Sequence, residues 1–129
     1  TDGLPGLALG EKIVLARQAS VGLIGVVRLD PNPRVIEALM ENPRLTEGLL
    51  LPLVANAEAL PAVLCVVAKN SRWGVRHAVR LALARNPRVP TFEALPLLLG
   101  LTRAELRSVA ADLRLAAQVR QRARLLVGA

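Results

Sequence analysis

The fold is decided by two matching segments, Met40-Glu41-Asn42-Pro43-Arg44-Leu45 and Ala84-Arg85-Asn86-Pro87-Arg88-Val89, which lie 44 residues apart and share Asn-Pro-Arg. The same offset places Leu51-Pro52-Leu53 onto Leu95-Pro96-Leu97. Lys69-Asn70-Ser71-Arg72 is a third, similar segment between helices, but it does not fit the 44-residue offset. A repeated unit of this length, built of four short helices, is typical of a stacked helical array.

The segments between these copies have the pattern of short helices. Asn42-Pro43 and Asn86-Pro87 each end one, because a residue before proline is pushed out of the helical region. Asn32, Thr46 and Ser71 are the expected N-caps, and Thr102 with Glu105 forms a capping box. The predicted helices span 10–19, 21–29, 33–41, 47–55, 59–69, 71–85, 90–99, 103–113 and 117–127.

Composition favours the same fold class. The apolar residues are mainly Leu, Ala and Val, with one Trp, one Phe and no Tyr. Leu and Ala are strong helix formers, and no stretch alternates with the period of a strand. We therefore predict an all-α protein, an α-solenoid of about nine short antiparallel helices of the HEAT-like or ARM-like type. Residues 1–9 are expected to be a flexible lead-in, and 10–129 a single α-helical repeat domain.

The repeat segments resemble a known family. Val75-Arg76-His77-Ala78-Val79-Arg80, leading to Asn86-Pro87-Arg88-Val89-Pro90, is similar to the bacterial HEAT-like repeats, and closest to the leucine-rich repeat variant type. The resemblance covers about residues 28–101. It implies a right-handed superhelix and a recognition role, and it specifies the fold far better than the partner.

The charge of the chain is uneven. Residues 1–60 carry a net charge of −2 and residues 61–129 a net charge of +9, and fifteen of the seventeen cations are Arg. A basic half points to an acidic partner, which is a nucleic acid, an anionic lipid or an acidic protein surface. The alternative is that arginine enrichment reflects codon usage in a GC-rich genome.

Arginines recur at helical spacing in this basic half. Arg72, Arg76 and Arg80 are predicted to form one stripe on a single helix, and Arg103 with Arg107, and Arg120 with Arg124, repeat the pattern. Stacked helices would place such stripes side by side, as a ladder suited to phosphate or carboxylate. The alternative is an ordinary solvated face. The complete candidate surface for an anionic partner is Arg72, Arg76, Arg80, Arg85, Arg88, Arg103, Arg107, Arg120 and Arg124.

Trp73 is the one large aromatic residue with two competing interpretations. It is expected either to pack at the start of a helix or, less favoured, to be an exposed anchor for a partner.

No residue pattern predicts catalysis. His77 is the only histidine and Cys65 the only cysteine, so a site with several His or Cys ligands is excluded within one chain. Glu37 and Glu41 lie one helical turn apart and are expected to be solvated. The scattered glycines form no phosphate-binding loop. We therefore predict no catalytic residue, no cofactor and no metal.

Two binding functions remain open. The first is a scaffold that binds a protein partner through the helical-repeat surface. The alternative is binding of duplex nucleic acid, through its phosphates, by the arginines of residues 72–124. The longest uncharged runs have ten residues, about half of a membrane span. We expect no membrane partner, a cytoplasmic location, and further chain or a partner against the glycine-rich N-terminal side.

Overall fold

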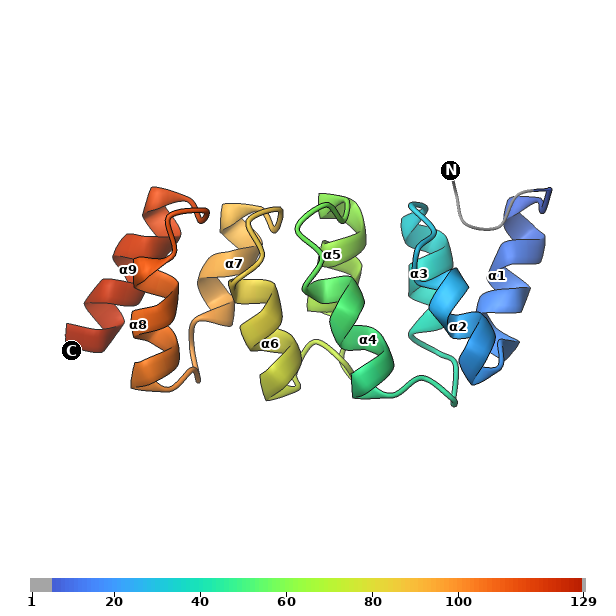
Figure 1. The fold of residues 1–129 in the computed structure, drawn as a ribbon, viewed down its shortest axis with the longest axis horizontal. Helices are drawn as coiled ribbons and strands as arrows, with labels where there is room; N and C mark the ends of the chain where they lie inside the picture. Colours follow the sequence, from blue (N-terminus) through green and yellow to red (C-terminus); the bar gives the residue numbers. More distant parts are fainter. Residues whose placement is uncertain (1–5, 129) are drawn as a thin grey trace.

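The computed structural model describes residues 6–128, and within this range the chain is all-helical, with no strand. The helices lie side by side in a row that runs from α1 at one end to α9 at the other (Figure 1). Their bounds are α1 Leu9–Gln18, α2 Val21–Val27, α3 Pro33–Leu39, α4 Glu47–Val54, α5 Pro61–Lys69, α6 His77–Ala84, α7 Thr91–Leu97, α8 Arg103–Ala111 and α9 Ala117–Gly128. The prediction of an all-α protein is confirmed. Most of the expected lead-in falls on residues 1–5, outside the described residues.

Helices two apart along the chain pack against each other. α1 packs against α3, α3 against α5 and α7 against α9, and on the other side of the molecule α4 packs against α6. Contacts between consecutive helices join the two sets, most extensively between α8 and α9. The result is an elongated two-layer arrangement rather than a ball (Figure 1).

Three of the predicted N-caps form as expected. The Asn32 side chain accepts a hydrogen bond from the amide of Arg34, and the Thr46 side chain accepts one from the amide of Leu49. At α8 the Thr102 hydroxyl accepts from the Glu105 amide at 3.2 Å, while Glu105 Oε1 accepts from the Thr102 amide at 2.8 Å. These bonds satisfy amides that have no partner within the helix.

The helix predicted over 71–85 is wrong in its first turn and a half. Residues 71–76 form tight turns, and α6 begins at His77. This turn requires glycine at position 74, because a Cβ there would lie 2.4 Å from the carbonyl oxygen of Ala68 at the end of α5. Asn70, not Ser71, organises the segment: its Oδ1 accepts from the amides of Arg72 and Trp73, each at 2.9 Å.

The turn after a helix repeatedly caps the end of the helix two places earlier. Asn42, after α3, donates from Nδ2 to the carbonyls of Ala16 and Ala19 at the end of α1, at 2.9 and 3.0 Å. Asn86, after α6, donates to Val54 and Asn56 at the end of α4, at 2.8 and 2.9 Å. Both asparagines are buried. Because the last carbonyls of a helix lack partners within it, these bonds fasten each layer together.

Two other turns do the same with different side chains. After α5, Trp73 donates from Nε1 to the carbonyl of Met40 at the end of α3, at 3.2 Å. After α8, Arg114 donates from Nη2 to the carbonyl of Arg85 at the end of α6, at 3.3 Å. The Asn-Pro-Arg turns are therefore two examples of a contact that recurs along the chain. In each case a side chain after one helix donates to the end of the helix two places earlier, and the residue that donates differs.

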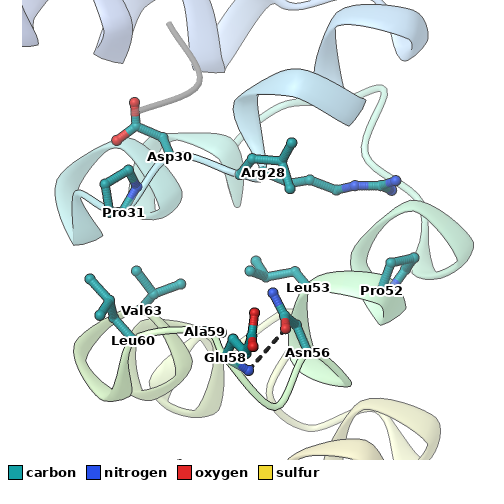
Figure 2. Close-up of a pocket in the computed structure, with 11 residues that line it drawn as sticks. Arg28, Asp30, Pro31, Pro52, Leu53, Asn56, Glu58, Ala59, Leu60 and Val63 are labelled. Atoms are coloured by element: carbon teal, nitrogen blue, oxygen red, sulfur yellow. Dashed lines mark hydrogen bonds between the residues drawn. The ribbon is translucent and has the colours of Figure 1, made fainter. Parts of the chain in front are cut away.

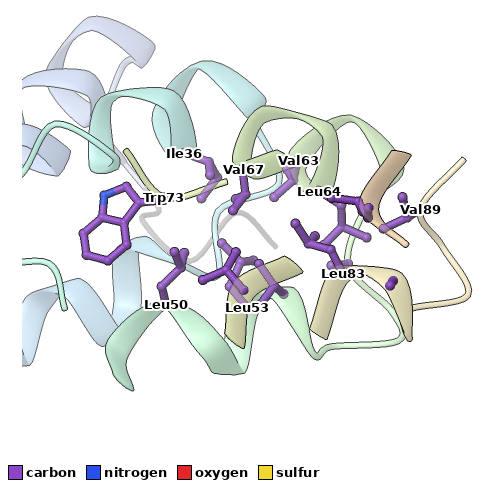
Figure 3. Packing of buried hydrophobic residues seen from close by; sticks show 14 of the residues in the cluster. Ile36, Leu50, Leu53, Val63, Leu64, Val67, Trp73, Leu83 and Val89 are labelled. Atoms are coloured by element: carbon purple, nitrogen blue, oxygen red, sulfur yellow. The ribbon is translucent and has the colours of Figure 1, made fainter. Parts of the chain in front are cut away.

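The core lies between the two layers and is aliphatic apart from Trp73. Ile36 and Val67 from one layer meet Leu50 and Leu83 from the other, with Trp73 at one end of the cluster (Figure 3). At about 25 cal/mol per Å² of apolar surface removed from water, this burial is the main term favouring the fold.

Candidate recognition surface

The first predicted arginine stripe does not exist as a stripe. Because residues 71–76 form turns, Arg72 and Arg76 are not in register with Arg80 on one helix. The guanidinium groups of Arg72 and Arg76 lie 4.9 and 4.7 Å from the centroid of the Trp73 ring instead. Arg76 also pairs with Glu47, with 3.4 Å between Nη1 and Oε1. These two cations are engaged with the protein itself.

Trp73 is only 1% exposed, so the interpretation as an exposed anchor is wrong. Its ring packs in the core and its Nε1–H is bonded to Met40. The packing interpretation is confirmed, although the residue lies in the turn before α6 and not at a helix start. The arginines above it cover the edge of the core.

Arg80 closes the end of α7. Its Nη2 donates to the carbonyls of Pro96 and Leu99, both at 2.9 Å. These carbonyls belong to the last turn of α7 and the segment that follows it, where helical partners run out. The guanidinium group of Arg80 therefore has a structural use.

The second half of the predicted surface is different. Arg103 and Arg107 are exposed on α8, as is Arg124 on α9, and within residues 6–128 none of the three makes a side-chain hydrogen bond or ion pair. Arg107 and Arg124 line one shallow depression of about 220 Å³ with Ala110, Ala111 and Val127. We call Arg103, Arg107 and Arg124 the α8–α9 arginines. Arg120 instead donates from Nε to the carbonyl of Leu115.

Sequence reasoning missed a groove between α4 and α6. It has a volume of about 340 Å³ and is lined by Leu51 of α4 and Ala55 just after it, by Ala78, Leu81 and Ala82 of α6, and by Arg85 and Arg114 at one end. We call it the α4–α6 groove. Arg85 belongs to the predicted surface and lines this groove, whereas Arg88 does not, although it is exposed.

Arg114 is held rigidly at the end of the groove. Its Nε and Nη2 donate to the two carboxylate oxygens of Asp112, at 3.1 and 2.8 Å. These hydrogen bonds, above all, hold the pKa of Asp112 below its usual range and raise the pKa of Arg114. The Asp112 Oδ1 also accepts from the Arg114 amide at 3.0 Å.

A sequence signal for Arg114 was available. An Asn or Asp is followed two residues later by Arg at 32/34, 42/44, 70/72, 86/88 and 112/114. In each pair the side-chain oxygen accepts a hydrogen bond from the arginine amide. Reading Asn or Asp as equivalent in this turn would have identified Arg114.

A second pocket, of about 210 Å³, lies between the loop after α2 and the loop after α4. Two of its charged residues contact the protein itself: Arg28 donates to the carbonyl of Leu49 at 2.8 Å, and buried Asp30 lies 3.4 Å from Lys12 Nζ. Figure 2 shows Asp30 pointing away from Leu60 and Val63, which line the opposite wall. Arg28 and Asp30 therefore have partners within the protein, and Glu58 is the remaining charged residue of the lining.

In the described part of the chain, the residues that could take part in catalysis or metal binding do not cluster at one site. His77 contacts Glu105 at 2.8 Å across α6 and α8, and no group of three or more His, Cys, Asp or Glu residues within 6–128 could hold a metal ion. Hydrogen bonds from the Thr102 amide and from His77 lower the pKa of Glu105. Burial, with the charge of Glu93 second, raises the pKa of the Cys65 thiol. Thiolate is the reactive form, so this shift opposes reactivity.

The N-terminal side exposes apolar surface. A depression of about 510 Å³ lies along α1 and is lined by Leu7, Gly10, Glu11, Val14, Leu15 and Gln18. Leu7 and Val14 are exposed. The expectation that further chain or a partner covers this side stays a prediction.

In the part of the chain that the structure describes, no helix has the length and hydropathy to cross a bilayer. Comparison with known proteins finds no family model, no curated protein and no solved structure that matches this chain.

Proposed function

We propose that this chain is a HEAT-like α-solenoid that binds a protein partner without catalysing a reaction. The repeat type is supported by the Asn42 and Asn86 turns, which make the same pair of bonds to the helix two places earlier. Stacking of such units produces extended surfaces for recognition.

The observation that carries the function is the α4–α6 groove. Leu51, Leu81 and Ala82 are only partly buried, so apolar side chains of two neighbouring helices remain accessible along this groove. An apolar groove between two helices is suited to binding the apolar face of a peptide or a helix.

The test is selection of peptides from a random display library on the full chain. A variant with the channel filled, Ala82→Arg, is the comparison, with Ala104→Arg on the exposed part of α8 as the matched control. We expect peptides enriched on the wild-type chain to bind Ala104→Arg and to lose binding to Ala82→Arg. Failure to enrich any peptide, or equal binding to both variants, would contradict the proposal. Circular dichroism establishes that each variant is folded.

A second candidate function is binding of duplex nucleic acid. It is favoured by the α8–α9 arginines, which are exposed and have no partner within residues 6–128. Phosphate binding needs cations but no aromatic platform. Charge reversal at Arg103 and Arg107 would then abolish binding of a labelled duplex, while binding of a selected peptide in the groove would persist.

A further inference from the structure

Helix α6 carries apolar residues on two faces. Val79 and Leu83 are buried in the core. Ala78, Leu81, Ala82 and Arg85 follow at i, i+3, i+4 and i+7, which is a second face, and it lines the α4–α6 groove. A helix needs one apolar stripe to pack in a globular protein. Leu81 and Ala82 also pack partly against the core, and the side of this second stripe that remains accessible is available to a ligand.

The small side chains along the α4–α6 groove favour the close approach of a bound peptide backbone. Three of the five apolar lining residues are alanines, at positions 55, 78 and 82. The distance between packed helices depends on the side chains at their contact, so alanines let a helix approach closely. Leu51 and Leu81 then offer the bulkier contacts between which apolar side chains of the ligand can insert.

The end of the groove is positively charged. Arg85 makes no side-chain hydrogen bond to any of residues 6–128, and Arg114 uses Nε and Nη2 but leaves Nη1 available. Asp112 neutralises one of these two charges. Arg85 can therefore bind a carboxylate through two parallel hydrogen bonds, whereas Arg114 can add one hydrogen bond from Nη1.

We propose that the α4–α6 groove binds an acidic amphipathic protein segment, with apolar side chains between Leu51 and Leu81 and a carboxylate against Arg85 and Arg114. This inference rests on the proposed function, because it names the chemistry of the partner. It uses a site separate from the α8–α9 arginines. The floor contains no aromatic residue, so it offers no platform for base stacking.

The experiment measures fluorescence anisotropy of a fluorescein-labelled, twelve-residue peptide with leucine at i, i+3, i+4 and i+7 and glutamate at most other positions. The matched peptide has glutamine in place of every glutamate. Each is titrated with the full chain, with Arg85→Glu, and with Arg103→Glu. The last variant changes the net charge equally but lies on α8, away from the groove.

We expect the glutamate peptide to bind the wild-type chain, and to bind Arg85→Glu at least about tenfold more weakly. Arg103→Glu should bind within about twofold of wild type, and the glutamine peptide at least about tenfold more weakly than the glutamate peptide. Equal losses in the two variants, equal binding of the two peptides, or no binding at about 100 μM protein would each overturn the inference. Displacement of the peptide by micromolar dodecanoate would also overturn it, in favour of a fatty-acid ligand.

The two proposals fail in different ways. If the display library yields peptides that need the groove but are neutral or basic, the acidic partner is excluded and the scaffold function stands. If the library yields no peptide, both proposals fail.

Discussion

Two arginine-rich regions look alike in sequence and differ in structure. Arg72, Arg76 and Arg80 recur every four residues, as do Arg103 and Arg107. In the first region the helix is interrupted at residues 71–76, and all three guanidinium groups contact the protein itself: the Trp73 ring, Glu47 and the end of α7. In the second region α8 is continuous, and both arginines extend into solvent.

Spacing in the sequence alone therefore does not define a charged surface. A periodic pattern becomes a stripe only if the backbone is helical throughout, and residues 71–76 form turns instead, with Gly74 at a close approach to Ala68 that leaves no room for a Cβ. Positive charge available to a partner is therefore found at the α8–α9 arginines, at Arg85 with Arg114, and at the exposed Arg88 and Arg122. The first region stabilises the fold, and the second is available for binding.

The largest effect is expected at Trp73. Trp73→Ala removes a buried ring, its bond to Met40 and the platform for Arg72 and Arg76, and should lower the free energy of unfolding by about 3–5 kcal/mol. Trp73→Phe keeps a ring and loses the Nε1 donor, so it should cost less. Urea unfolding followed by circular dichroism measures both. Equal stability of Trp73→Ala and wild type would show that the first arginine-rich region does not stabilise the fold through Trp73.

The next-largest effect is expected at Arg80, and comparing it with Arg107 tests the difference between the two arginine-rich regions. Arg80→Ala removes two hydrogen bonds, to the carbonyls of Pro96 and Leu99, of which Pro96 keeps the Leu99 amide as a donor. It should lower the free energy of unfolding by about 1–2 kcal/mol. Arg107→Ala removes an exposed side chain without a partner and should change it by less than about 0.5 kcal/mol. Thermal and urea unfolding of the pair provide the test. A larger loss for Arg107→Ala would reverse the assignment of the two regions.

A smaller effect is expected at Glu105, which bridges the regions by contacting His77. Its pKa is lowered in the folded chain from a value near 4.5. The carboxylate therefore contributes stability that is present above the pKa of the unfolded chain, and that stability is lost as pH falls through the folded pKa. Glu105→Gln should be less stable than wild type at neutral pH, and the difference should shrink below about pH 4.3. Unfolding midpoints measured against pH check this, and a difference that is constant down to pH 2 would contradict it.

The smallest effect concerns nucleic acid. We expect a labelled random-sequence duplex to bind weakly at low salt and to dissociate near physiological salt, as non-specific phosphate contacts do. Arg103→Glu with Arg107→Glu should remove this binding. The control, Arg72→Glu with Arg76→Glu, should weaken it less, because those cations already face Trp73 and Glu47. Anisotropy at several salt concentrations distinguishes the cases, and tight binding at physiological salt would make nucleic acid the leading function.

Local signals in the sequence predicted most of the fold. The Asn-Pro pairs correctly predicted where helices end, and the Thr102 capping box formed as expected. Both effects depend only on residues within one turn of each other. The helix start at Ser71 was wrong because the close approach of Gly74 to Ala68 is visible only in three dimensions. The donation from Asn42 to α1 spans 26 residues, so the repeat indicated its importance without its partner.

The candidate surface was less predictable. The sequence identified Arg85 as a candidate but not the groove beside it, because the lining comes from α4, α6 and the loop after α8. Alanines such as Ala78 and Ala82 do not distinguish a core face from a groove in sequence. Arg114 was missed because its turn begins with Asp in place of Asn, although the hydrogen bond it forms is the same.

We propose that this chain recognises its partner through the α4–α6 groove. The most direct test is a titration of the ¹⁵N-labelled chain with the leucine–glutamate peptide, followed by ¹H–¹⁵N correlation spectra. We predict that shifted amides cluster at Leu51, Ala55, Ala78, Leu81 and Ala82 and extend to Arg114. Shifts confined to α8 and α9 near Arg107 and Arg124, or no shift at saturating peptide, would contradict the account.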